Sequence, residues 1–228
     1  MGAFDLSKTP QGGLGFLGYS LDPTFSQFNL VGEVEERHEL WGQPGKLKFL
    51  AYINRGNIAA YSDAIAWGAA NGMPPVLDAV RQYQTKPGFV INLEQQITPD
   101  LGFFAQVGWM NGRYEPFDTS DVDRTVLAGF SISGNLWGRP YDTIGVAGAV
   151  NGISKVHQAF LNAGGQGTLL GDGQLSYPST EHIFETYYSC TLSESSNLTF
   201  DYQFIQNPAY NTDRGPVNLF ATRYIWHF

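Results

Sequence analysis

Nine or ten segments of this 228-residue chain alternate apolar and polar side chains. In residues 197–206, NLTFDYQFIQ, large apolar residues stand at positions 198, 200, 202 and 204, with polar residues between them. A period of two places successive side chains on opposite faces of a β-strand. The segments run for about nine to twelve residues, longer than most strands of globular sheets and close to the length that a tilted strand needs to cross a bilayer. The pattern predicts an all-β fold with long strands.

The connections between these segments alternate in length. The short ones are 40–45, 98–100, 135–142 and 193–196, and the long ones are 57–87, 112–122, 154–180 and 207–217. Short turns on one side and long loops on the other are typical of outer-membrane barrels, whereas a two-sheet sandwich has no reason to alternate in this way. The sequence therefore predicts an antiparallel transmembrane β-barrel of the outer-membrane type, with about ten strands in one domain, residues 1–228. Segments 57–87 and 154–180 are expected to be extracellular or pore-folded loops.

Composition agrees with a barrel and excludes several classes. The formal charge is −8, which argues against nucleic acid as a partner. The chain has no run of about eighteen apolar residues, so no transmembrane helix is predicted. A mean hydropathy of −0.19 is compatible with membrane strands, because the apolar residues of one face and the polar residues of the other average out. Cys190 has no second cysteine with which to form an internal disulfide. The N-terminal MGAFDLSKTP does not resemble a signal peptide, so either a leader has been removed or the chain is not the whole gene product.

Charged residues of the strands fall on the parity opposite to the apolar residues of the same strand. They are Glu33, Glu35, Arg37, Lys48, Glu94, Asp201 and Arg223. A charge facing lipid at the midplane of a barrel costs about 2–4 kcal/mol. We therefore expect the apolar parity to face lipid and the charged parity to line a water-filled lumen. The alternative is a soluble β-protein of the envelope, in which the apolar parity forms a packed core.

Catalytic and metal-binding patterns are weak. The four histidines show no metal-ligand spacing, and no Ser/His/Asp arrangement is recognisable. Glu33 and Glu35 share a face and could form a carboxylate pair for glycoside hydrolysis, but luminal charges that hydrate a pore explain them more simply. The sequence predicts no enzyme, no metal and no cofactor.

Two stretches of the chain carry a family resemblance. FNLVGEVEERHELWGQPGKLKFLAYINRGNIAAYSDAIA (28–66) and YSCTLSESSNLTFDYQFIQNPAYNTDRGPVNLFATRYIWHF (188–228) resemble the OprB-type carbohydrate-selective porins of Gram-negative outer membranes. The likeness extends over about residues 25–228 and implies a barrel of about sixteen strands that passes sugars. The family's N-terminal strands have no counterpart in this chain, so a closed pore formed by this chain alone is in question.

The resemblance implies a passive, carbohydrate-selective channel in the bacterial outer membrane. The residues expected to line its pore are Glu35, Arg37, Lys48, Glu94, Asp201 and Arg223 on the strands, and Asn54, Arg55 and Trp67 at a strand end and in a loop. The expected partners are mono- or oligosaccharides, outer-membrane lipid and the barrel-assembly machinery, with Tyr224, Trp226 and Phe228 as the assembly signal. A monomer and a homo-oligomer are both left open, as are a soluble glycan-binding protein and a truncated barrel without a working pore.

Overall fold

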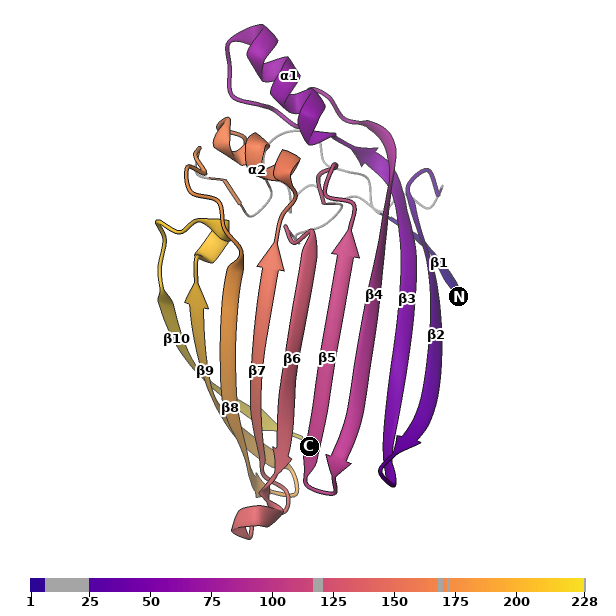
Figure 1. Cartoon of the computed structure of the whole chain (residues 1–228), viewed down its shortest axis with the longest axis vertical. Helices are drawn as coiled ribbons and strands as arrows, with labels where there is room; N and C mark the ends of the chain where they lie inside the picture. Colours follow the sequence, from indigo (N-terminus) through magenta and orange to yellow (C-terminus); the bar gives the residue numbers. More distant parts are fainter. Residues whose placement is uncertain (7–24, 117–120, 168–169, 172, 228) are drawn as a thin grey trace.

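Ten strands form one antiparallel sheet, in which each strand pairs with its neighbours in sequence (Figure 1). The computed structural model describes residues 1–6, 25–116, 121–167, 170–171 and 173–227. The strands are β1 (Gly2–Asp5), β2 (Phe28–Leu40), β3 (Gln43–Ile58), β4 (Gln82–Thr98), β5 (Leu101–Met110), β6 (Arg124–Ser133), β7 (Thr143–Gly152), β8 (Glu181–Ser193), β9 (Ser196–Gln206) and β10 (Val217–Trp226). The predicted all-β antiparallel fold is confirmed.

The strands differ from the prediction at the start of the chain. The alternation in the sequence makes GLGFLGYSL, residues 13–21, the first candidate strand, but this segment lies outside the described residues. The first strand of the structure is instead β1, whose four residues pair with β2 from Gly2–Val31 to Asp5–Phe28. Four residues are too few to show a reliable period of two, so the sequence did not reveal this strand.

The alternation of short and long links is confirmed. The short links lie at one end of the sheet, here called the turn end, and are residues 41–42, 99–100, 134–142 and 194–195. The long links lie at the opposite end, here called the helical end, and are residues 59–81, 111–123, 153–180 and 207–216 (Figure 1).

The helical end carries α1 (Tyr61–Asn71), α2 (Lys155–Asn162) and the short 3₁₀ helix η2 (Pro208–Tyr210). A second 3₁₀ helix, η1 (Gly134–Trp137), lies at the turn end. The Ala-rich stretch after Ser62 and Asp63 predicts short helices in the link between β3 and β4, capped by one of these two residues. Helix α1 is present, but Ala60 stands at its N-cap. Helix α2 was not expected, because glycines dominate the rest of its loop. In the described part of the chain, no helix is long and apolar enough to span a membrane.

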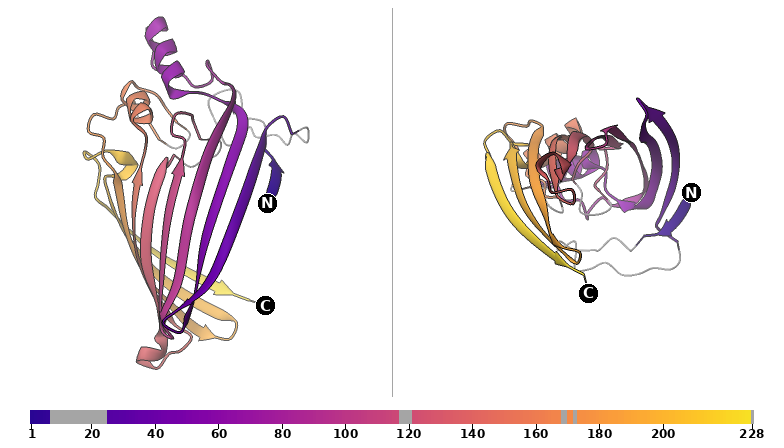
Figure 2. Two further views of the ribbon diagram at one scale, coloured as in Figure 1. Left: turned by 45° about the vertical axis from the view of Figure 1, so that its right-hand side comes forward. Right: turned by 90° about the horizontal axis from the view of Figure 1, so that it is seen from below.

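The sheet curves like a section of a barrel wall, with β1 and β10 at its two edges (Figure 2). Within the described residues those two edge strands do not pair, so the sheet is open. Helices α1 and α2 lie over the hollow of the curve when the sheet is viewed from its turn end (Figure 2). The outer, convex side carries no helix among the described elements.

The two parities of the strands separate onto the two faces of the curved sheet. The convex face carries the apolar parity, and Val34, Val126, Phe200 and Phe220 expose between 51% and 80% of their surface there. Aromatic rings on this face meet across neighbouring strands, as in Phe49–Phe89 and Phe89–Trp109 with centroids 6.3 and 5.7 Å apart. The apolar parity is therefore an uncovered surface and not the packed core that the soluble alternative requires.

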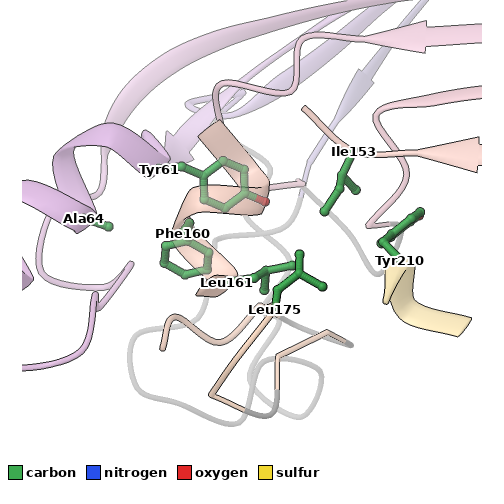
Figure 3. Close-up of a cluster of buried hydrophobic side chains, with 7 residues drawn as sticks. All are labelled: Tyr61, Ala64, Ile153, Phe160, Leu161, Leu175 and Tyr210. Atoms are coloured by element: carbon green, nitrogen blue, oxygen red, sulfur yellow. The ribbon is translucent and has the colours of Figure 1, made fainter. Parts of the chain in front are cut away.

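The buried hydrophobic cluster lies at the helical end of the sheet. It consists of Tyr61, Ala64, Ile153, Phe160, Leu161, Leu175 and Tyr210 (Figure 3). Helix α1 supplies the first two of these residues and α2 supplies Phe160 and Leu161, so the cluster joins the two helices to the links that follow β7 and β9. Burial of apolar surface thus fixes the loops rather than the strands.

Three aromatic rings on the concave face cover a glycine of the adjacent strand. Tyr52 pairs with Gly88, Phe104 with Gly129, and Tyr187 with Gly145. A Cβ atom added to Gly145 would lie 2.1 Å from Tyr187 Cε1, which is far inside van der Waals contact. The glycine therefore leaves the space that the ring occupies, and the ring covers a backbone that has no side chain of its own.

The substitution Gly145→Ala is expected to destabilise the sheet by about 1–3 kcal/mol, because the new methyl group displaces the Tyr187 ring. Gly148→Ala is the matched control on the same strand, since its Cβ would meet nothing nearer than the Ile183 carbonyl oxygen at 3.8 Å. The urea midpoint of the detergent-solubilised protein measures the effect. Equal midpoints for the two variants would contradict the steric explanation.

The link between β6 and β7 is fastened to β8 through a buried carboxylate. Asp142 has a side chain that is 2% exposed and forms an ion pair with Arg139. It also accepts hydrogen bonds from the Tyr188 hydroxyl and, at 3.0 Å, from the Thr191 amide. The hydrogen bond from Arg139 lowers the pKa of Asp142 to about 2, helped by Tyr188 and Thr191 and opposed by burial.

Because the folded pKa of Asp142 is depressed, the carboxylate stabilises the fold above its ordinary pKa, and that contribution is lost as the pH falls from about 4 towards 2. In this pH window we expect the urea midpoint of the wild type to fall by more than the midpoint of Asp142→Asn. The variant should have the lower midpoint of the two at pH 7. Asp213→Asn, in an exposed loop, is the control and should follow the wild type. Parallel pH profiles for wild type and Asp142→Asn would refute the assignment.

Candidate functional site

The first group of charges on the concave face lies on β2 and β3. Glu35 and Lys48 are direct partners in the antiparallel register, and Lys48 Nζ lies 3.2 Å from Glu35 Oε2. The same ammonium lies 3.9 Å from Glu33 Oε1, and Arg37 Nε lies 2.6 Å from Glu35 Oε1. The Arg37 side chain is 82% exposed, so this network of four charges faces open space. All four were predicted on the parity that faces the lumen, and the structure brings them together.

The network continues onto β4 towards the turn end. Lys46 Nζ lies 2.8 Å from Glu94 Oε2, and the two residues are direct partners in register. Together with Arg37 and Phe104 they line a cavity of about 630 Å³ on the concave face. Glu94 was predicted as a site residue, while Lys46 was not, although its parity is that of Lys48.

A second group of polar residues lies on β8, β9 and β10. Asp201, Gln203 and Arg223 line a cavity of about 610 Å³ together with Glu185. Gln203 Nε2 donates a hydrogen bond of 3.2 Å to Glu185 Oε2. Asp201 and Arg223 were predicted and lie in this one cavity, whereas Glu185 was missed. Its parity, opposite to that of Phe184, was the signal that could have found it.

The strands between the two groups are uncharged on the concave face. For example, the residues paired in register across the strands from Lys48 are Asn92, Gln106, Leu127 and Ala149. The described concave positions of β5, β6 and β7 carry no Asp, Glu, Lys or Arg. The two charged groups therefore lie towards the two sides of the curve, separated by a neutral wall (Figure 2). Their separation is a consequence of strand order and was not readable from the sequence alone.

The remaining predicted residues lie apart from these groups. Asn54 is on the concave face near the helical end, where its Oδ1 accepts a hydrogen bond of 2.5 Å from Asn29. Arg55 is on the convex face, because it pairs with Phe28 in the apolar parity, so its predicted position in the lumen is wrong. Trp67 is half-buried on α1, beyond the ends of the strands.

The predicted assembly residues lie at the end of the chain. Tyr224 and Trp226 are 61% and 60% exposed on the convex face of β10. Phe228 lies outside the described residues. The role of these three residues in assembly stays a prediction.

A Ser, a His and an Asp lie close together at the helical end, a proximity that the sequence did not reveal. His157 Nδ1 lies 3.2 Å from Asp123 Oδ2, and Ser154 Oγ accepts a hydrogen bond of 3.1 Å from the His157 backbone amide. The Ser154 hydroxyl donates to the Gly112 carbonyl, so it caps α2 and does not face the imidazole ring. His157 is fully buried and stacks on Tyr61, with ring centroids 4.2 Å apart.

The electrostatics of this junction are those of a structural contact. Burial acts to raise the pKa of Asp123, but hydrogen bonds from His157 and from the Ser154 amide outweigh it, so that the pKa lies below its ordinary value. A substrate cannot reach the buried imidazole, and the three side chains do not form a nucleophilic triad. In the described part of the chain, no three His, Cys, Asp or Glu side chains come together in a way that could hold a metal ion.

A second junction at the helical end joins the links before and after β4 and β5. Glu115 forms a bidentate ion pair with Arg81, at 2.7 and 2.9 Å. The same carboxylate accepts a hydrogen bond of 2.7 Å from the Ala59 amide, and its residue is only 4% exposed. Lys86, buried beside it, donates to the Tyr114 carbonyl at 3.1 Å. This junction holds α1 and its flanking chain over the concave face.

The comparison with protein families agrees with this arrangement of faces and loops. The model of the family "Carbohydrate-selective porin, OprB family" matches residues 2–228. The chain belongs to this family. The resemblance seen in the sequence is thereby confirmed over nearly the whole chain. Among curated proteins, none matches the sequence.

A solved structure of an OprB protein has the same fold. The chain is similar to Pseudomonas putida OprB, determined at high pH, with a TM-score of 0.68 and 18% sequence identity. The similarity covers 92% of this chain and 50% of that protein, so this OprB-family chain spans about half the length of the porin it matches. At this identity the comparison establishes the fold of the wall and not the identity of the luminal residues.

Proposed function

We propose that the protein allows passive, carbohydrate-selective diffusion of sugars across the bacterial outer membrane through a water-filled lumen. The observation that carries the proposal is the division of the curved sheet into two different faces, in a chain of the OprB family. The convex face exposes aliphatic and aromatic residues, and the concave face carries paired charges. Lipid solvates the first face and water the second. The helical end, with its long links, faces the outside of the cell, and the turn end faces the periplasm.

The chemistry of the concave face suits neutral polyols. Carboxylates, ammonium groups and side-chain amides can exchange hydrogen bonds with sugar hydroxyl groups, while most of these charges already have an opposite charge within 4 Å. Internal pairing weakens the attraction for free ions. The aromatic rings of Tyr52, Phe104 and Tyr187 on the same face offer flat apolar surface to sugar rings. Glu35, Arg37, Lys48, Glu94, Asp201 and Arg223 are the residues we assign to the lumen.

Planar-bilayer conductance tests the proposal. The protein is expected to open ohmic channels whose current falls as glucose or a malto-oligosaccharide is added, because a sugar bound in the lumen obstructs the ions. Swelling of proteoliposomes in isotonic sugar gives an independent readout. Open channels whose current and swelling are indifferent to sugars would refute carbohydrate selectivity.

The open sheet favours one alternative, a membrane-embedded wall without a working pore. A lumen requires the edges β1 and β10 to be paired, since unpaired backbone groups are not tolerated in lipid. Protein that needs detergent and shifts on gels between heated and unheated samples, but never conducts, would support this alternative. Recovery of the folded protein in buffer alone would instead support the soluble glycan-binding alternative.

A further inference from the structure

Two arginines interrupt the apolar convex face near the helical end. Arg55 follows Ile53 by two residues on β3 and therefore shares its face. Arg124, on β6, is the direct partner of Trp109 on β5. Both arginines are exposed. The pore proposed above gives neither of them a role, because they lie on the side of the sheet away from the lumen.

An apolar groove of about 790 Å³ lies on the convex face beside these arginines and extends across β1 to β5. Its floor is formed by the small residues Gly32 and Ala51, partners across β2 and β3. Its walls are formed by larger side chains, among them Leu30, Phe49, Ile53, Phe89 and Trp109. Arg55 is two residues from Ile53 on the same face of β3, and Arg124 is the partner of Trp109 across β5 and β6. Each arginine therefore lies beside a residue that lines the groove.

Neither arginine is neutralised on this face. Among the described residues, neither forms an ion pair: Arg55 donates to Thr85 Oγ1 at 3.4 Å and lies 5.9 Å from the centre of the Tyr83 ring, and Arg124 donates to the Ile153 carbonyl at 3.5 Å. Asp5 lies in the same row as Arg55, but the whole of β2 separates them. These weak contacts leave most of both guanidinium forks free for a stronger acceptor, and phosphate is the anion that the fork fits in a bidentate manner.

We propose that this groove and its two arginines bind a phosphorylated, acylated glycolipid of the lipid A class from the outer leaflet. Acyl chains lie along the groove between Phe49, Phe89 and Ile53, and the phosphate groups contact Arg55 and Arg124. The proposal rests on the proposed function, because it needs the convex face in lipid and the helical end outside. Charge complementarity distinguishes this occupant from a zwitterionic phospholipid, whose phosphate is already balanced by its own cation.

Native mass spectrometry of the detergent-solubilised chain, titrated with lipid A, measures the binding. Lipid A is expected to bind more tightly than phosphatidylcholine, and monophosphoryl lipid A to bind at an intermediate level. The double variant Arg55→Gln/Arg124→Gln should weaken lipid A binding by about tenfold or more, since each change removes a charge-assisted contact. The double variant Arg37→Gln/Lys46→Gln, which removes the same two charges from the concave face, is the matched control and should bind lipid A as the wild type does.

A second variant tests the groove separately from the charges. Ala51→Trp fills the floor of the groove on an exposed position, so lipid A should bind more weakly although both arginines are intact. Equal affinities for lipid A and phosphatidylcholine, or unchanged lipid A binding in the double variant, would overturn the proposal.

Conductance in the same preparation separates this proposal from the proposed function. If the channels respond to sugar but lipid A binds no better than phosphatidylcholine, the lipid site is refuted and the proposed function is not. If lipid A binds specifically through the two arginines but no channels form, the lipid site is supported and the sugar channel is refuted.

Discussion

Substituting Glu115 by alanine should release α1 from the concave face while leaving the strands folded. The carboxylate pairs with Arg81 and accepts the Ala59 amide in a site that is 4% exposed. Removing one partner of a buried ion pair costs about 3–5 kcal/mol, because the other charge stays buried without compensation. Local opening with that free energy should speed hydrogen exchange at the Tyr61 amide, which donates to the Arg113 carbonyl, by about a hundredfold or more.

The glutamine variant is the matched control for this prediction. Glu115→Gln keeps an oxygen that can accept the Ala59 amide and loses only the charge, so its effect on exchange should be smaller than that of Glu115→Ala. Amides in the middle of β8 and β9 should exchange as in the wild type in both variants. Faster exchange throughout the sheet would show that the junction supports the whole wall and not only the loops.

Reversing the charge of Lys48 should change the ion selectivity of the channel. Lys48 lies 3.2 Å from Glu35 and 3.9 Å from Glu33, so Lys48→Glu would place three carboxylates close together on the concave face. Their mutual repulsion, about 1 kcal/mol per pair in water and more at a lower effective dielectric constant, is relieved by bound cations. We expect cation preference to rise severalfold, read as a shift of the reversal potential in a salt gradient, and current reduction by sugar to weaken.

The control for this prediction is the same substitution away from the network of Glu33, Glu35 and Lys48. Lys155 is an exposed residue at the start of α2, and Lys155→Glu makes the same change in net charge. Its reversal potential should stay close to that of the wild type. High salt should reduce the difference between the two variants, because screening weakens exposed charges. An equal shift in both variants would indicate that net charge rather than luminal position sets selectivity.

Parity predicted much of the candidate site. Because side chains alternate strictly along a strand, the sequence placed Glu35, Lys48, Glu94, Asp201 and Arg223 opposite the apolar residues of their strands, and the structure agrees. The same rule, applied to Lys46 and Glu185, would have found both.

Arg55 was assigned to the lumen from its closeness to a strand end and not from its parity. A displacement of one residue moves a side chain to the other face. Arg55 instead lies on the convex face, two residues from Ile53, which lines the groove there.

The sequence by itself determined the all-β class, the alternation of links and the two faces, because these depend on local periodicity. It did not determine strand length, since β3 and β4 have 16 and 17 residues where about nine to twelve were predicted. Only the tertiary structure decided which residues meet. Pairing across strands joins Lys48 to Glu35, buried polar contacts join Glu115 to Arg81, and the curve of the sheet separates the two charged groups. Such contacts link residues far apart in the chain, and no local pattern specifies them, because each depends on the register and curvature of the whole sheet.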